Sequence, residues 1–151
     1  MDIVVQLGVE DIVGEMKDVD PTAINELLNR GITPVVSPVS NDVDGDGGLN
    51  VNADIAAAAV AGALNAKELI IMTDVSGIYR NWPDENSLIA SITKAELEAI
   101  KAEFQDGMAP KVQACLDAIS AGAGAVRIID GRKPQAFADA LAHHGGTLVT
   151  S

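Results

Sequence analysis

Short, continuous apolar runs alternate with longer segments of helical spacing along this chain. The run "ELIIMTDV" (68–75) is apolar at nearly every position, which is typical of a central parallel strand buried on both faces. "AVRIID" (125–130) and "GTLVTS" (146–151) predict two further strands, and the β-branched run "TPVVSPV" (33–39) predicts another buried strand. The β-rich segment 2–19 predicts a hairpin.

Helix start signals separate these runs. Asp20-Pro21 places an N-cap before a proline at the first helical position. Asn52 is expected to cap an alanine-rich helix, and Thr93-x-x-Glu96 forms a capping box. The predicted helices are 22–30, 53–66, 94–104, 111–121 and 135–144.

Strands that alternate with helices favour an α/β fold, in which a mainly parallel sheet lies between helical layers. Neither a repeat nor a low-complexity segment nor a clear linker interrupts the 151 residues. Residues 1–151 are therefore predicted to form a single domain.

The composition restricts the kinds of partner. Apolar residues make up 48% of the sequence and aromatic residues only 3%, so aliphatic side chains must build the core. Ten basic residues stand against 22 acidic ones, which gives a formal net charge of −12. Because nucleic acids and anionic membranes require a basic face, neither is expected as a partner.

Cys115 is the single cysteine, which excludes an internal disulfide. Its apolar neighbours recur at helical spacing, which favours a buried structural thiol over a nucleophile and fits a reducing compartment. The sequence has no basic-then-apolar leader and no apolar run of about eighteen residues, so neither export nor membrane spanning is indicated. The predicted location is cytoplasmic.

The stretch "DVDGDG" (42–47) resembles the start of a calcium loop, with carboxylates at alternate positions. Such a loop needs a bidentate glutamate at its twelfth position, and that position is Ala53. A solvated acidic turn between strands is the better interpretation, and no metal ligands are predicted.

Two other features are less easily explained by local structure. In "NVNAD", an Asx-type turn with a helix cap explains one asparagine and the aspartate, but not Asn50, Asn52 and Asp54 together. Lys111 falls in the first turn of a helix, where a cation opposes the helix dipole at a cost of about 0.3–1 kcal/mol. An anion bound to the free N–H groups of that turn would make the lysine there favourable rather than costly. The alternative is an exposed lysine on the solvent face.

Three motifs in order carry a family resemblance. "LNVNADIAAAAVAGAL", "LIIMTDVSGIY" and "GMAPKVQACLDAISAGAGAVRIIDGR" resemble the amino acid kinase superfamily, and within it the acetylglutamate kinases. The resemblance extends over essentially the whole chain and implies the carbamate kinase-like, three-layer α/β/α fold. The chain resembles the C-terminal, ATP-binding half of these enzymes together with the preceding substrate loop.

In that family the γ-phosphoryl group of ATP passes to a carboxylate oxygen, here the side-chain carboxylate of N-acetylglutamate in arginine biosynthesis. The resemblance implies that Lys111 stabilises the transferring phosphoryl group and that Asp54 organises the site by pairing with lysines. It also implies that Asn50 and Asn52 lie at the substrate. Magnesium would arrive with ATP, held mainly by phosphate oxygens.

The nucleotide pocket implied by the resemblance is built from two segments, the end of the strand 68–75 with its loop and the residues around "EFQDGM". Its members are Asp74, Val75, Ser76, Gly77, Ile78, Tyr79, Glu103, Phe104, Gln105, Gly107 and Met108.

The departure from the family is large. The family chain is about twice as long, and its N-terminal half carries a glycine-rich phosphate loop with a second catalytic lysine and an arginine for the substrate. Neither motif is found in this sequence. Three hypotheses stay open: a minimal acetylglutamate kinase, a non-catalytic nucleotide-binding module or half-enzyme, and a kinase for another acid. Two protein partners stay open: further copies of this chain in a homo-oligomer, and a separate N-terminal half.

Overall fold

The computed structural model describes residues 18–151 except 43, 44, 46 and 105. Most of the hairpin predicted over 2–19 lies outside the described residues. The helices are α1 (Thr22–Asn29), α2 (Ala53–Ala63), α3 (Lys94–Ile100), α4 (Ala109–Ser120) and α5 (Pro134–Leu141). The strands are β1 (Val39–Asn41), β2 (Gly48–Asn50), β3 (Leu69–Thr73), β4 (Ser91–Thr93), β5 (Ala125–Asp130) and β6 (Thr147–Thr150). Three short 3₁₀ turns are η1 (Glu85–Ser87), η2 (Lys101–Glu103) and η3 (Asp106–Met108).

The main sheet has four strands in the order β3-β5-β6-β4. β3 runs parallel to β5, with Leu69 opposite Val126 and Thr73 opposite Asp130. β4 is parallel to β6, whereas β5 and β6 are antiparallel. Two of the three pairings are therefore parallel, which confirms the predicted α/β fold with a mainly parallel sheet.

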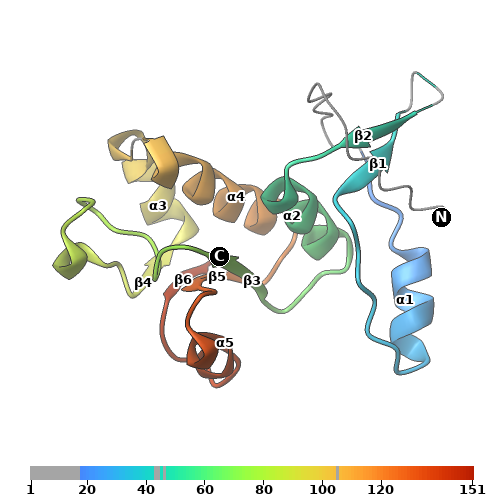
Figure 1. Ribbon diagram of the computed structural model, residues 1–151. Helices are drawn as coiled ribbons and strands as arrows, with labels where there is room; N and C mark the ends of the chain where they lie inside the picture. Colours follow the sequence, from blue (N-terminus) through green and yellow to red (C-terminus); the bar gives the residue numbers. More distant parts are fainter. Residues whose placement is uncertain (1–17, 43–44, 46, 105) are drawn as a thin grey trace.

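Helices cover both faces of this sheet. Figure 1 shows α2, α3 and α4 on one face and α5 on the other, which makes three layers. The core lies between α4 and the sheet, where Val112, Cys115 and Leu116 pack with Ile128 and Val149. The buried Cys115 confirms the structural thiol predicted from its helical spacing.

Small side chains bring α2 close to the C-terminal end of α4. A methyl group added at Gly62 would lie 2.4 Å from the Ala121 Cβ and 2.6 Å from the Ala121 carbonyl oxygen. Only glycine therefore fits at this crossing, and the alanine-rich sequence of α2 serves close helix packing.

The predicted capping signals are confirmed. The Asn52 side chain accepts hydrogen bonds from the backbone N–H groups of Asp54 (2.9 Å) and Ile55 (3.3 Å). The Thr93 hydroxyl accepts from the N–H of Glu96, and the Glu96 carboxylate accepts from the N–H of Thr93. These contacts fix the starts of α2 and α3.

The predicted strand over 33–39 is wrong for most of its length. Residues 32–37 form no strand, and Val35 is 91% exposed. Pro34 and Pro38 lack backbone donors, so this segment offers few groups to a sheet ladder. Only its last residue, Val39, enters a strand, where it begins the short antiparallel β1–β2 pair.

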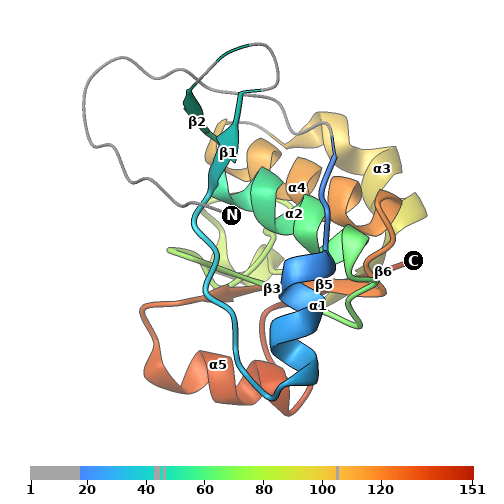
Figure 2. The same cartoon turned by 90° about the vertical axis from the view of Figure 1, so that its right-hand side faces the viewer.

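β3 is also not the central strand expected from its apolar sequence. It lies at the edge of the sheet, and Met72 is 55% exposed. Within the described residues its outer edge has no paired strand, so the run is only partly buried. Figure 2 shows α1 and the β1–β2 pair on this same side of the molecule.

Smaller differences concern helix ends and β4. α1 begins at Thr22, after Pro21, although the Asp20 carboxylate still accepts from the Thr22 N–H at 2.9 Å. α2 ends at Ala63, and α3 ends at Ile100 before a 3₁₀ turn, so both are shorter than predicted. No strand was predicted at β4, because three residues carry too little periodicity. No helix in the described part of the chain is long and apolar enough to cross a membrane.

Candidate functional site

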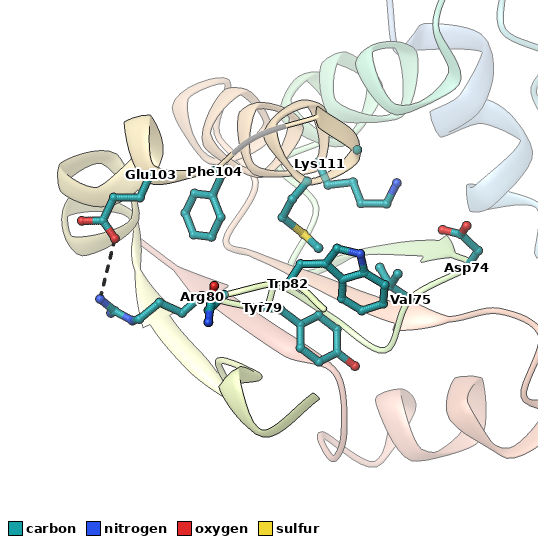
Figure 3. A pocket seen from close by; sticks show the side chains of 11 residues that line it. Asp74, Val75, Tyr79, Arg80, Trp82, Glu103, Phe104 and Lys111 are labelled. Atoms are coloured by element: carbon teal, nitrogen blue, oxygen red, sulfur yellow. Dashed lines mark ion pairs between the residues drawn. The ribbon is translucent and has the colours of Figure 1, made fainter. Parts of the chain in front are cut away.

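A pocket of about 620 Å³ lies between the loop that follows β3 and the segment that leads from α3 into α4. Open α/β sheets bind ligands at the carboxyl ends of their strands, which is where this pocket is placed. Figure 3 shows the side chains that converge on it. They are Asp74, Val75, Tyr79, Arg80, Asn81, Trp82, Glu103, Phe104, Gly107, Met108 and Lys111.

One end of the pocket carries opposite charges. Lys111 stands in the first turn of α4, and its side chain extends toward Asp74 at the end of β3 (Figure 3). The hydrogen bond from the Thr73 hydroxyl, 3.0 Å long, lowers the pKa of Asp74, and the charges of Lys111 and Arg132 add to the effect. A cation and an ionised carboxylate therefore face the pocket beside a helix N-terminus.

The middle of the pocket is apolar and aromatic. The rings of Tyr79 and Trp82 lie edge to face, with centroids 5.1 Å apart. Tyr79, Phe104 and Met108 are buried, whereas Trp82 is 55% exposed. Such a surface can pack against a planar, apolar ligand group.

The other end is bounded by a weak ion pair. Arg80 Nη1 and Glu103 Oε2 are 4.0 Å apart, and both side chains are more than half exposed. Figure 3 shows this pair joining the loop after β3 to the segment after α3. A solvent-exposed pair of this kind can open at little cost.

The segment 76–78 supports the pocket rather than lining it. Ile78 is fully buried, and its N–H donates to the Thr147 hydroxyl on β6 at 2.8 Å. A methyl group at Gly77 would lie 2.4 Å from that hydroxyl oxygen. The Ser76 hydroxyl accepts from Lys133 at 3.1 Å. These contacts position Tyr79, which follows directly.

The amino acid kinase family matches residues 3–130 of this sequence. The chain belongs to the amino acid kinase family. The acetylglutamate kinase of Corynebacterium urealyticum is 46% identical over 141 residues, which cover 92% of this chain and 46% of that protein. That of Paenarthrobacter aurescens is 48% identical over 135 residues, covering 83% and 43% respectively. The chain thus spans less than half the length of these relatives.

Two solved structures have a similar fold. Smu.665 from Streptococcus mutans matches with a TM-score of 0.71 and 30% identity, over 92% of this chain and 51% of that one. Carbamate kinase from Giardia lamblia bound to AMP-PNP matches with a TM-score of 0.71 and 25% identity, over 86% and 48%. The predicted carbamate kinase-like fold is therefore confirmed. This chain forms only part of that fold, because it covers about half of each solved structure.

Most of the residues that the family resemblance assigned to nucleotide come together in the pocket. Asp74, Val75, Tyr79, Glu103, Phe104, Gly107, Met108 and Lys111 line it. Ser76, Gly77 and Ile78 lie behind this lining, and Gln105 is outside the described residues. Their roles in nucleotide binding stay predictions.

The sequence did not point to Arg80, Asn81 or Trp82, which also line the pocket. "RNW" falls in a segment read only as a loop. The signal available was Trp82 itself, because it is the single tryptophan in a chain with few aromatic residues.

The family's substrate-loop residues lie apart from this lining. Asn50 ends β2 and is exposed, and the side-chain oxygen of Asn52 (Oδ1) is occupied by its capping bonds. Within the described residues, no ion pair within 4.0 Å joins Asp54 to Lys111. The Asp54 charge nevertheless contributes, after burial, to raising the pKa of Cys115, which lies one turn beyond Lys111 on α4. α2, which carries Asp54, packs against α4, and the pairing of Asp54 with Lys111 stays a prediction.

Asp42 directly follows β1 and Gly47 directly precedes β2, so the two ends of the acidic stretch lie between strands, as predicted. The Asp42 N–H donates to the Gly47 carbonyl oxygen at 2.9 Å. Among the described residues, no group of three or more His, Cys, Asp or Glu side chains is placed to hold a metal ion.

Proposed function

We propose that this chain binds ATP in the pocket between β3 and α4 and serves phosphoryl transfer to the side-chain carboxylate of N-acetylglutamate. The observation that carries the proposal is Lys111 in the first turn of α4, extended toward Asp74 across the mouth of an aromatic pocket. In this strongly acidic chain, a lysine in the first turn of a helix suits an anion with several charged oxygens.

The nucleotide orientation follows from the charged end of the pocket and its aromatic middle. The phosphates lie at Lys111 and the start of α4, while the base lies against Trp82 and Tyr79. Asp74 and Val75 border the ribose between them. Carbamate kinase from Giardia lamblia, a solved structure with this fold, was bound to AMP-PNP, which supports an ATP-type ligand.

The reaction requires positioning and charge neutralisation more than covalent help from the protein. An oxygen of the acceptor carboxylate forms a bond to the γ-phosphorus as the bond to the β–γ bridging oxygen breaks. The products are an acyl phosphate and ADP. Lys111 stabilises charge on the transferred group, and Asp54 holds Lys111 in place when the cleft is complete. The acceptor is already ionised, so no general base is needed.

Magnesium suits this site as an ion that comes with the nucleotide. Mg²⁺ in kinases is held by phosphate oxygens, water and one or two carboxylates, and Asp74 is the carboxylate beside Lys111. The ion neutralises phosphate charge when bound.

A second candidate is a nucleotide-binding half that does not turn over alone. It is favoured because the chain spans 46% or less of the acetylglutamate kinases cited above. The exposed Asn50 and the outer edge of β3 also leave room for another polypeptide on that side of the site. In this case a complementary chain, corresponding to the remaining length of the relatives, would supply the acceptor site.

Two measurements separate these candidates. Calorimetric titration with Mg-ATP tests binding, and a coupled assay of ADP release with and without N-acetylglutamate tests turnover. Binding with turnover supports the kinase, and binding alone supports the half-enzyme, whose turnover should return with a complementary chain. Absence of binding, or affinity unchanged in both Lys111→Ala and Asp54→Ala, would refute the site.

A further inference from the structure

An arginine outside the pocket lining connects the loops that follow β3 and β5. Arg132 donates from Nε to Asp130 Oδ1 at 2.9 Å and from Nη2 to Asp130 Oδ2 at 3.1 Å. The Asp130 side chain is only 5% exposed, at the carboxyl end of β5, whereas that of Arg132 is 69% exposed. This two-point contact with a fixed carboxylate orients the guanidinium plane.

The oriented guanidinium reaches the neighbouring loop. Arg132 Nη2 also donates to the backbone carbonyl of Asp74. One residue earlier, the Gly131 N–H donates to the Thr73 carbonyl at 2.8 Å. Lys133 Nζ donates to the Ser76 hydroxyl at 3.1 Å. Residues 131–133 therefore bond to the segment 73–76 at three points.

Asp74 and Val75 line the pocket, but Arg132 does not. We propose that Arg132 is a positioning residue, which holds Asp74 and Val75 at the pocket by clamping the Asp74 carbonyl to Asp130. The consequence for nucleotide binding rests on the function proposed above, whereas the clamp itself does not.

The clamp requires the shape of arginine. A guanidinium presents a planar fork that can serve a carboxylate and a carbonyl together, whereas an ammonium is a single point charge. Lys133 illustrates the difference, because its Nζ is 3.7 Å from Asp130 Oδ2 and bonds only a hydroxyl in the loop. Arg132→Lys should therefore restore charge without restoring the clamp.

Hydrogen exchange of the ligand-free chain tests the clamp directly. In Arg132→Met, amides of residues 74–79 should exchange about tenfold faster, which corresponds to losing one hydrogen bond of a charged donor. Arg30→Met, the same charge change at the exposed end of α1, is the matched control. Equal exchange of this segment in the two variants would overturn the proposal.

Nucleotide affinities then show how Arg132 acts. Because the clamp positions residues at the nucleoside, Arg132→Met should weaken adenosine, ADP and ATP, measured without magnesium, by the same factor, about tenfold. Arg132→Lys should weaken them similarly. A loss confined to ADP and ATP, or full recovery by lysine, would overturn the proposal and indicate a charge contact with phosphate. If the unmodified chain bound no nucleotide, the proposed function would fail, while the exchange comparison would still decide on the clamp.

Discussion

The Tyr79 and Trp82 rings meet edge to face in the pocket wall, with centroids 5.1 Å apart and planes inclined at 62°. Tyr79 is buried and packs against the Trp82 ring, and Trp82 is 55% exposed. A buried ring thus supports an exposed one at the position proposed for the base of the nucleotide.

Trp82→Ala should lower ATP affinity, because base stacking on an aromatic side chain contributes about 1–3 kcal/mol. Trp82→Phe keeps an aromatic face and should retain most of the affinity. Since Trp82 is the single tryptophan, Mg-ATP should also change the intrinsic fluorescence of the unmodified chain. Calorimetry measures the ATP affinity of each variant. If Trp82→Ala bound ATP as tightly as the unmodified chain, the base would not lie against Trp82.

Lys111→Met should change stability and affinity in opposite directions. Removing a cation from the first turn of α4 should leave the free energy of unfolding unchanged or raise it by up to about 1 kcal/mol. The same change should weaken Mg-ATP binding at least about tenfold, because a charge-assisted contact to phosphate is lost. Urea unfolding and calorimetry measure the two effects. Lys67→Met, at an exposed lysine outside the pocket lining, is the control, and a loss of stability in Lys111→Met would contradict the assignment.

Arg127→Met should destabilise the fold strongly. Arg127 Nε lies 2.7 Å from Glu68 Oε1, and its side chain is 4% exposed. Among the described residues, the Glu68 carboxylate, which is 19% exposed, would keep only His143 Nδ1 at 3.6 Å, and the loss should be up to about 3–5 kcal/mol. Arg80→Met, which breaks the exposed pair with Glu103, should cost no more than about 1 kcal/mol. Urea unfolding distinguishes them, and similar losses in both variants would show that burial does not set the effect.

Asp130 should contribute to stability against acid. The hydrogen bond from Arg132 is the main cause that lowers the Asp130 pKa to about 2, from an ordinary value of 3.8. A lowered pKa stabilises the fold fully above the unfolded value, and this contribution is lost as pH falls from about 4 through about 2. Asp130→Asn should therefore lose less stability over this window than the unmodified chain. Urea midpoints at several pH values measure this, with Asp117→Asn as the control, and identical slopes would exclude the contribution.

Cys115 should be unreactive in the folded chain. Burial, with a smaller contribution from the Asp54 charge, raises the pKa of the thiol to about 12. Because the thiolate is the nucleophile, a thiol reagent at neutral pH should label Cys115 only as fast as the chain opens. Labelling followed by mass spectrometry, with and without urea, tests this. Rapid labelling without urea would show that the α4 face of the core is accessible.

The candidate site was partly readable from the sequence. "TDVSGIY" and "GMAPK" identified both walls of the pocket, because each places its residues at the end of a strand or the start of a helix. These motifs could not show which of their residues line the pocket and which lie behind its wall. Ile78 and Tyr79 are neighbours, yet the first is held behind the pocket by Thr147 and only the second lines it.

The sequence by itself determined where α2 and α3 begin. Asn52 and the Thr93–Glu96 pair cap their helices through bonds that span two or three residues, so the necessary groups are adjacent in the sequence. Only the tertiary structure decided that β3 is an edge strand and that Arg132 meets Asp74, 58 residues away. The order of the strands in the sheet determines both features. An apolar run predicts a strand, but it does not indicate which strands will pair with it.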